Sequence, residues 1–392
     1  MTQHPYSTSN INTTSFAERI LTWFDVYGRH DLPWQQHHKS DKDIYAVWLS
    51  EIMLQQTQVT TVRGYFERFI TRFPTVQDLA VANWDEVAEL WAGLGYYARA
   101  RNLHAAAHQL CDFIDKHQSF PQTIADWQNI KGVGRSTAGA IVAMGVGGFG
   151  VICDGNVKRV LTRWAGVDDD ITKSSTDKRL WELATTLTPL HDSGRYAQAM
   201  MDMGATLCTR TKPKCHACPI ADDCTAHQQG NPTAYPVKSK KPAKPIRHSH
   251  VLFIQHNQHM LWVQRPNDGI WGGLWCTPLH TLSPNDMADN LADCTIADWL
   301  LLRHTLMSSI GIKHSLTHFY WQLDVCTIVL NDKEFYKLNQ ILDNIRTPYQ
   351  WLDDTATNAI AKPAALVKLL TKLTTNKNFS QPTQNLLSYQ AV

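Results

Sequence analysis

Residues 208–224 read CTRTKPKCHACPIADDC and place four cysteines, Cys208, Cys215, Cys218 and Cys224, within one short loop. Soft thiolate ligands at such spacing favour an iron–sulfur cluster or zinc. Zinc ribbons usually carry two close cysteine pairs, whereas this loop has one close pair flanked by wider gaps. A [4Fe–4S] cluster is therefore the predicted cofactor, with zinc as the alternative. Three basic residues in the first gap indicate a loop that could also present positive charge to phosphates.

The chain changes character on the two sides of a basic, proline-rich segment. Apolar residues recur at helical spacing through residues 15–226, which predicts a mainly α region. Residues 231–247 contain four prolines, five basic residues and no acidic residue, so we expect a linker that builds neither helix nor core. Strand-like runs follow at 251–254, 260–263 and 319–325, with helical segments between them, which predicts a smaller α+β domain.

Composition excludes several classes of protein. The 392 residues are 43% hydrophobic, and the 37 basic side chains nearly balance the 35 acidic ones, so the chain is not disordered. It contains no apolar run of about 18 residues and no secretory leader pattern, so we expect a cytoplasmic protein with no membrane partner. Because the net charge is only +2, affinity for a nucleic acid would have to come from local patches or backbone amides.

A glycine-rich turn opens onto a small-residue helix at Gly132-Val133-Gly134-Arg135-Ser136. Glycines in such a turn allow successive backbone N–H groups to converge on a phosphate, next to the positive end of a helix. A tight connection between two helices explains the glycines about as well. The spacing differs from that of a nucleotide-triphosphate loop, so a nucleotide ligand is not expected.

Two carboxylates have contrasting predicted surroundings. Asp43 is expected to cap a helix on whose apolar face Glu51 falls, and a carboxyl buried there would be protonated and suited to act as a general acid. Asp154 precedes a second helix, and as its N-cap would be ionised with a low pKa. An ion-paired Glu51 and a purely structural Asp154 are the alternatives. One neutral and one anionic carboxyl together are the arrangement that cleaves a glycosidic bond.

These features together resemble the helix–hairpin–helix DNA glycosylase superfamily, and specifically the MutY-type adenine DNA glycosylases. Besides the four cysteines, the matching segments span almost the whole chain in the family's order: 32–35, 48–59, 93–103, 132–138, 154–159, 199–204 and 269–275. The resemblance implies a six-helix barrel module with a cluster module over 1–230, a linker over 231–248, a Nudix-like lesion-recognition domain over 249–370 and a tail over 371–392.

The resemblance also implies the roles of individual residues. Glu51 is expected to protonate N7 of an extruded adenine, Asp154 to stabilise the oxocarbenium ion, and Asn156 to assist them. Related lyases have a lysine where Ser136 stands, so a monofunctional enzyme that leaves an intact abasic site is expected. The implied DNA contacts are Gln55, Gln56, Thr57, Tyr96, Gly132, Val133, Gly134, Arg135, Arg159, Arg163, Thr317 and His318. Tyr96 matches the family's wedge into the base stack.

The implied partner is duplex DNA with adenine opposite 8-oxoguanine or guanine, bound by a monomer at the nucleoid of a prokaryote-like cell. Thr317 and His318 fall in the family's lesion-reading loop, in which Leu316 replaces a phenylalanine. No acidic Nudix box is present, so pyrophosphate hydrolysis is not expected. An endonuclease III-like pyrimidine-lesion lyase and a non-catalytic iron–sulfur DNA-binding module are the alternative functions.

Overall fold

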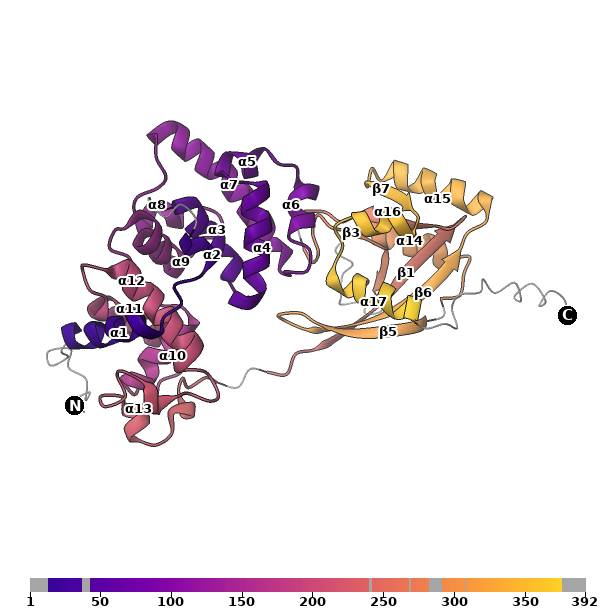
Figure 1. Ribbon diagram of the computed structural model, residues 1–392. Coiled ribbons are helices and arrows are strands. Elements are labelled where there is room, and N and C mark those ends of the chain that lie inside the picture. Colours follow the sequence, from indigo (N-terminus) through magenta and orange to yellow (C-terminus); the bar gives the residue numbers. More distant parts are fainter. Residues whose placement is uncertain are drawn as a thin grey trace. The chain divides into compact units, whose positions relative to one another are not determined.

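The computed structural model describes residues 13–36, 43–239, 242–267, 269–281, 291–306 and 308–375 (Figure 1). The chain forms two compact units. The first comprises residues 1–82 and 101–241, and the second comprises residues 83–100 and 242–392. The domain boundaries predicted from the sequence placed residues 83–100 in the first domain, whereas the structure places them in the second unit. Within the described residues, the predicted tail is helical up to Thr375, and the remainder of that tail lies outside them.

The first unit is helical, as predicted. Its elements are α1 (Thr13–Tyr27), α2 (Pro33–Gln36), α3 (Ile44–Leu54), α4 (Val59–Arg72), α5 (Val76–Val81), α7 (Tyr97–His117), α8 (Ile124–Gln128), α9 (Arg135–Ala140), α10 (Gly155–Trp164), α11 (Ser174–Leu187), α12 (Ser193–Asp202) and α13 (Thr225–Gln228). Helix α7 begins in the second unit and continues into the first. Among the described residues, no helix is both long and apolar enough to span a membrane.

Side-chain caps and two π-helical segments shape this unit. The Asp43 side chain accepts a hydrogen bond from the backbone N–H of Ala46, as predicted, and begins α3. The π-helices η2 (Ile141–Val146) and η3 (Met203–Leu207) extend α9 and α12, and η3 ends at Cys208. Short 3₁₀ turns lie at η4 (Cys215–Ala217) and η5 (Pro232–Ala234). A widened helix therefore leads directly into the cysteine loop.

A close backbone approach places the segment before Asp154 against α9. A Cβ on Gly139 would lie 1.9 Å from the carbonyl oxygen of Val151, and one on Gly150 would lie 2.1 Å from the carbonyl oxygen of Gly139. Both positions therefore require glycine. Val151, Ile152 and Cys153 are buried in the same apolar cluster as much of α10 and α12.

The first half of the predicted linker belongs to the first unit. The prediction that residues 231–247 build neither helix nor core is wrong, because η5 lies there and Tyr235 is buried. The carbonyl of Val237 accepts a hydrogen bond from the N–H of Ile171 at 3.1 Å. Ile246 begins the first strand of the second unit. The prolines of this segment lack a backbone N–H, which limits its backbone hydrogen bonds but does not prevent its side chains from packing.

The second unit is built on a seven-stranded mixed sheet. Its order is β3-β2-β1-β6-β5, with β4 paired to β1 and β7 paired to β2. The strands are β1 (Ile246–His256), β2 (His259–Gln264), β3 (Trp275–Cys276), β4 (Leu279–Thr281), β5 (Ser308–Ser315), β6 (Tyr320–Val329) and β7 (Tyr349–Leu352). The central pair β1 and β6 is parallel, and Val251 lies opposite Val325. The predicted α+β class is confirmed.

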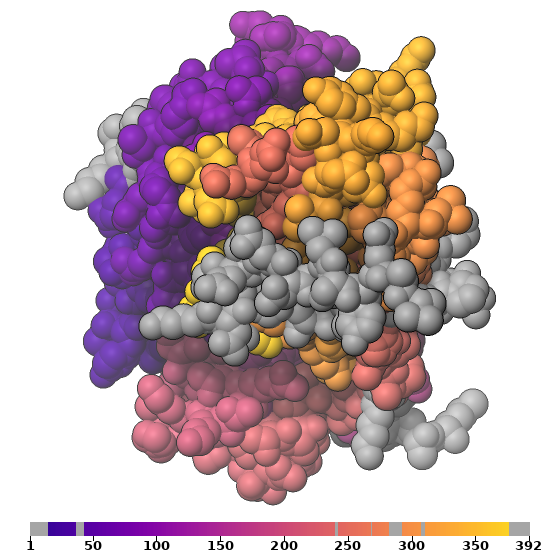
Figure 2. Space-filling view, turned by 90° about the vertical axis from the view of Figure 1, so that its right-hand side faces the viewer, coloured from indigo at the N-terminus to yellow at the C-terminus, as the bar shows by residue number. Residues whose placement is uncertain are grey.

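Helices cover both faces of this sheet. The helices after the first strands are α14 (Leu291–Leu301), α15 (Asp332–Asn344), α16 (Asp354–Ala359) and α17 (Ala364–Thr375). Residues of α14 and α15 pack on one face with Leu252 and Ile254. On the other face, α17 and Ala88 of α6 (Trp84–Leu90) share a cluster with Val251 and Phe253. In Figure 2 the yellow C-terminal segment borders the salmon segment near residue 270, where the N–H of Trp275 donates to the carbonyl of Ala361.

Candidate active site and cluster pocket

Glu51 and Asp154 lie within electrostatic range of each other in the first unit. Glu51 projects from α3, and Asp154 is the N-cap of α10. Burial, and to a lesser extent the nearby charge of Asp154, together raise the pKa of Glu51 to about 8. A carboxyl with this pKa holds a proton at neutral pH and can donate it.

The Asp154 carboxylate is fixed by the start of its helix. It accepts hydrogen bonds from the N–H groups of Asn156 at 3.0 Å and Val157 at 2.8 Å. The predicted low pKa is wrong: burial raises the pKa of Asp154 and outweighs these bonds and the positive charges of Arg159 and Lys158. The same bonds and charges nevertheless favour Asp154 as the place for a negative charge that the two carboxyls share.

Ser136 contacts the chain that leads into Asp154. Its hydroxyl oxygen accepts a hydrogen bond from the backbone N–H of Cys153 at 3.0 Å, directly before Asp154. It therefore ties α9 to the chain that enters α10. A serine hydroxyl cannot form a Schiff base with a sugar, because that reaction needs an amine.

Asn156 connects the carboxylate to the cysteine loop through Arg159. The Arg159 guanidinium donates to Asn156 Oδ1 at 2.9 Å, to the carbonyl of Gly204 at 2.6 Å and to the carbonyl of Cys208 at 2.9 Å. Gly204 lies in η3, where a Cβ would stand 2.6 Å from the Cβ of Asn156. The widened π-helical turn and its glycine thus let α10 and the loop approach closely. The guanidinium of Arg159 is engaged by the protein itself.

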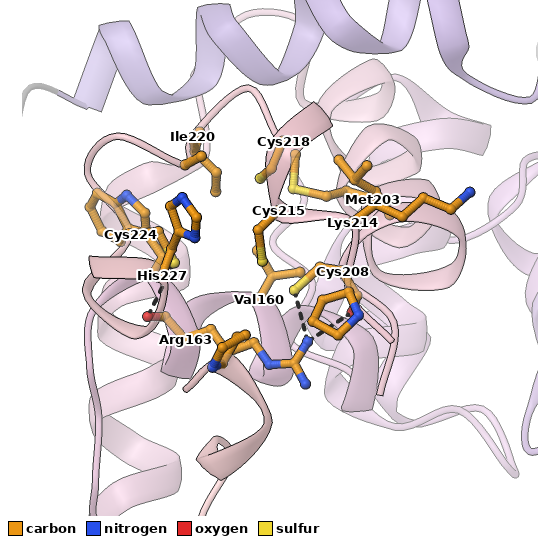
Figure 3. A pocket seen from close by; sticks show the side chains of 15 residues that line it. Val160, Arg163, Met203, Cys208, Lys214, Cys215, Cys218, Ile220, Cys224 and His227 are labelled. Atoms are coloured by element: carbon orange, nitrogen blue, oxygen red, sulfur yellow. Dashed lines mark hydrogen bonds between the residues drawn. The ribbon is translucent and has the colours of Figure 1, made fainter. Parts of the chain in front are cut away.

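The four cysteines line one pocket between α10, η3 and the loop (Figure 3). Val160, Met203 and Ile220 supply an apolar lining. Four soft thiols in an apolar pocket fit an iron–sulfur cluster, in which each thiolate can bind a separate iron. Within the described part of the chain, no three ligating side chains stand close enough to hold a single metal ion. Cys208, Cys215, Cys218 and Cys224 are the residues that would hold the cluster.

Arg163 organises this loop from inside. Its side chain is 2% exposed and donates to the carbonyls of Thr209 at 2.7 Å and Arg210 at 2.9 Å. It also donates to Sγ of Cys208 at 3.2 Å (Figure 3). The prediction that Arg163 contacts DNA is therefore wrong, since every direction of its guanidinium fork faces protein. The exposed basic side chains here are Arg210, Lys212 and Lys214.

The glycine turn is formed, but only part of its backbone is available. The Val133 side chain is buried and its N–H donates to the carbonyl of Ile130 at 3.1 Å, so the predicted contact of Val133 with DNA is wrong. Gly132, at φ +82°, lies in the left-handed region. Gly134 caps α9 and Arg135 begins it, where helical N–H groups point outward. The Arg135 guanidinium lies 3.9 Å from the ring centre of Trp181.

Residues after α3 meet this turn. The Gln55 amide donates to the carbonyl of Gly132 at 3.2 Å. Gln56 is exposed at φ +60°, a backbone conformation that is rare outside glycine. The Thr57 N–H donates to the carbonyl of Leu54 at 3.2 Å and closes the turn.

The remaining predicted residues belong to the second unit. Tyr96 is 53% exposed at φ +51°. Thr317 and His318 are exposed in the turn between β5 and β6, which the Leu316 N–H closes by donating to the carbonyl of Phe319 at 3.0 Å. Leu316 packs against the core beneath them. Thr317 and His318 thus face outward above a packed Leu316.

The sequence did not predict how two groups of residues pack. Asn156, Arg159 and Arg163 recur at helical spacing, which is the signal that they share one face of α10. The helical spacing over 15–226 assigned Trp84, Val87, Ala88 and Trp91 to the first, mainly α region, although residues 83–100 belong to the second unit. Periodicity shows that a face is buried but does not show what it packs against.

Comparisons with known proteins agree with this geometry. The family model described as HhH-GPD superfamily base excision DNA repair protein matches residues 49–185. The iron–sulfur binding domain of endonuclease III matches residues 208–224, and a NUDIX domain matches residues 250–372.

The proteins with similar sequences that we compared are both described as adenine DNA glycosylases. Adenine DNA glycosylase of Buchnera aphidicola subsp. Schizaphis graminum is 39% identical over 91% of this chain and 97% of its own length. The Homo sapiens protein of that description is 35% identical over 71% of this chain and 60% of its own length. The chain therefore belongs to the family of adenine DNA glycosylases and is a base-excision-repair enzyme that carries a [4Fe–4S] cluster.

Proposed function

We propose that this glycosylase removes adenine opposite 8-oxoguanine or guanine and leaves an intact abasic site. The observation that carries the proposal is the pair of buried carboxyls, in which Glu51 has a pKa of about 8 and Asp154 is held by two backbone N–H groups. A proton donor beside an anion is what hydrolysis through an oxocarbenium ion requires.

In the proposed mechanism, Glu51 donates its proton to N7 of the extruded adenine. The bond from C1′ to N9 then breaks, and its electron pair leaves with the adenine, which has become a neutral leaving group. The Asp154 carboxylate stabilises the positive sugar that remains, and a water molecule adds to C1′ and loses a proton to give the abasic sugar. Asn156 holds its position through Arg159 and supports Asp154.

The absence of an amine at Ser136 makes the enzyme monofunctional in this proposal. A lyase would need a lysine there to attack C1′ and cleave the strand. We assign Ser136 the task of holding the chain before Asp154, which its bond from the N–H of Cys153 supports.

For DNA binding, we propose Gln55, Gln56, Thr57 and Tyr96 around the opened base pair. The amides of Gly132, Gly134 and Arg135, together with the exposed loop of Arg210, Lys212 and Lys214, are proposed to contact phosphates. Thr317 and His318 are proposed to read the base opposite the adenine. We propose that the enzyme acts at the nucleoid as a monomer.

The experiment is single-turnover base release from a duplex with one 8-oxoguanine:adenine pair, with and without alkali. Guanine:adenine and thymine-glycol duplexes serve as comparisons. We expect free adenine from both adenine duplexes and strand breaks only after alkali. Strand breakage without alkali, or release from thymine glycol alone, would instead support the endonuclease III-like function. Binding without release would support the non-catalytic module.

A further inference from the structure

The short segment 83–100 is part of the second unit, although it lies between two helices of the first unit in sequence. Ala88 of α6 is 0% exposed and belongs to the core cluster that contains Trp262 and Leu274. Trp84 packs against the same cluster. Figure 1 shows α6 next to β3, where this core lies. The C-terminal sheet therefore completes one of its faces with a helix taken from far upstream.

One hydrogen bond fixes α6 to the loop before β3. The Trp84 indole N–H donates to the carbonyl of Gly273 at 3.1 Å, and the Gln264 amide donates to the same oxygen at 3.3 Å. Gly273 has φ +71°, and a Cβ there would stand 3.0 Å from the indole nitrogen of Trp84. Both the backbone conformation and the space at this contact therefore require glycine.

The loop after α6 is held at both ends and carries Tyr96 at its tip. The buried Trp91 donates its indole N–H to the carbonyl of Gly95 at 2.9 Å. The Arg99 guanidinium lies 5.2 Å from the ring centre of Trp91 and 5.7 Å from that of Tyr96. Tyr97 packs against the same core cluster as Trp84. The exposed Tyr96 side chain thus stands on a rigid support with a positive φ that the surroundings maintain.

We propose that Trp84 is a positioning residue that makes the second unit determine where Tyr96 stands. This inference rests on the proposed function, in which Tyr96 enters the base stack and the second unit reads the opposite base. The exposed Thr317 and His318 belong to the same compact body as Tyr96. Contact with the opposite base and opening of the stack are then coupled, since extrusion needs an inserted group held in place.

The test removes the hydrogen bond of Trp84, and a matched Trp→Phe control accounts for the smaller ring. Trp84→Phe keeps an aromatic ring and removes the indole N–H. Trp351→Phe is the matched control. The Trp351 indole N–H donates to Asn339 Oδ1 at 2.9 Å, and the Trp351 side chain packs against the cluster on the other face of the sheet. Base extrusion is followed by the fluorescence of 2-aminopurine next to the target adenine. The single-turnover rate, the dissociation constant for DNA and thermal unfolding are measured on the same proteins.

We expect Trp84→Phe to slow extrusion and release about tenfold while the control changes them less than twofold. The two variants should lose similar thermal stability. Gly273→Ala, which presses on the indole from the other side, should act in the same direction as Trp84→Phe. Equal effects of Trp84→Phe and Trp351→Phe on the extrusion rate would overturn the inference.

A double variant separates this inference from the proposed function. If Trp84 acts through Tyr96, Trp84→Phe should add less than twofold to the defect of Tyr96→Ala. Full additivity would overturn the inference while the assignment of Tyr96 stands. Release by Tyr96→Ala at the wild-type rate would overturn the wedge assignment and the inference together. Failure of the unaltered protein to release adenine would contradict the proposed function.

Discussion

The two units place polar residues in opposite ways. In the first unit, Glu51, Asp154 and Arg163 are buried or partly buried, and neighbouring backbone groups fix Asp154 and Arg163. In the second, Tyr96 and His318 stand exposed on turns whose backbones are anchored in an apolar core. Burial shifts pKa values and thus prepares groups for proton transfer, whereas exposure on a rigid turn suits contact with a large, variable partner. This contrast agrees with the proposal that the first unit carries the chemistry and that the second reads the opposite base.

The largest expected effect lies in the first unit. Glu51→Gln removes the proton donor and keeps the shape, so adenine release should fall at least about 10³-fold while DNA affinity stays within a few-fold. Single-turnover release and a binding titration measure the two quantities. Glu67→Gln, on the outward side of α4, is the control and should keep full activity. Equal losses of binding and release would show that Glu51 is not a purely chemical residue.

A side chain added at Gly204, where η3 contacts the start of α10, should have the second largest effect on adenine release. Gly204→Ala places a Cβ 2.6 Å from the Cβ of Asn156, so Asn156 and the start of α10 must move. A displacement of this size should lower the rate of release about 10- to 100-fold. Gly64→Ala in α4 meets only the end of the Arg68 side chain at 3.6 Å and should be neutral. Wild-type rates in both variants would exclude a role for the η3 contact.

The burial of Glu51 should also cost stability in a pH-dependent way. Its pKa is 4.5 in an exposed state and about 8 in the folded protein, so folding binds a proton between these values. The stabilising contribution of Glu51 is fully present below about pH 4.5 and is lost as pH rises toward 8. The stability of Glu51→Gln carries no such dependence, so it should rise by about 3–4 kcal/mol relative to that of the wild type between pH 5 and 8.

Denaturant unfolding at several pH values measures this difference. A constant difference between the two proteins across the range would mean that Glu51 ionises normally in the folded chain.

The smallest effect should come from the second unit. Thr317→Ala and His318→Ala remove exposed polar contacts, so the preference for 8-oxoguanine over guanine should fall about 3- to 30-fold while release opposite guanine is kept. Rates on the two duplexes measured side by side give the ratio. Ser315→Ala, just before the turn, is the control. An unchanged ratio in both variants would remove the recognition assignment of this turn.

The features that could be predicted from the sequence are those that depend on residues close together in the chain. Spacing along the chain predicted the cysteine loop, the Asp43 and Asp154 caps and the α+β character of the second unit, because each depends on residues close in sequence. The inward orientation of Arg163 and the attachment of Trp84 to Gly273 depend on contacts between distant segments. The pKa of Asp154 was mispredicted because its hydrogen bonds are local whereas its burial is set by tertiary packing.

The most direct test of the carboxyl pair is the pH dependence of single-turnover adenine release by the wild-type enzyme. Because Glu51 must hold a proton, the rate should fall about tenfold per pH unit above pH 8. Because Asp154 must be ionised, the rate should also fall in acid, at a pH above the usual range of an aspartate. A rate that stays constant from neutral pH to well above pH 9 would contradict the assignment of Glu51 as the proton donor.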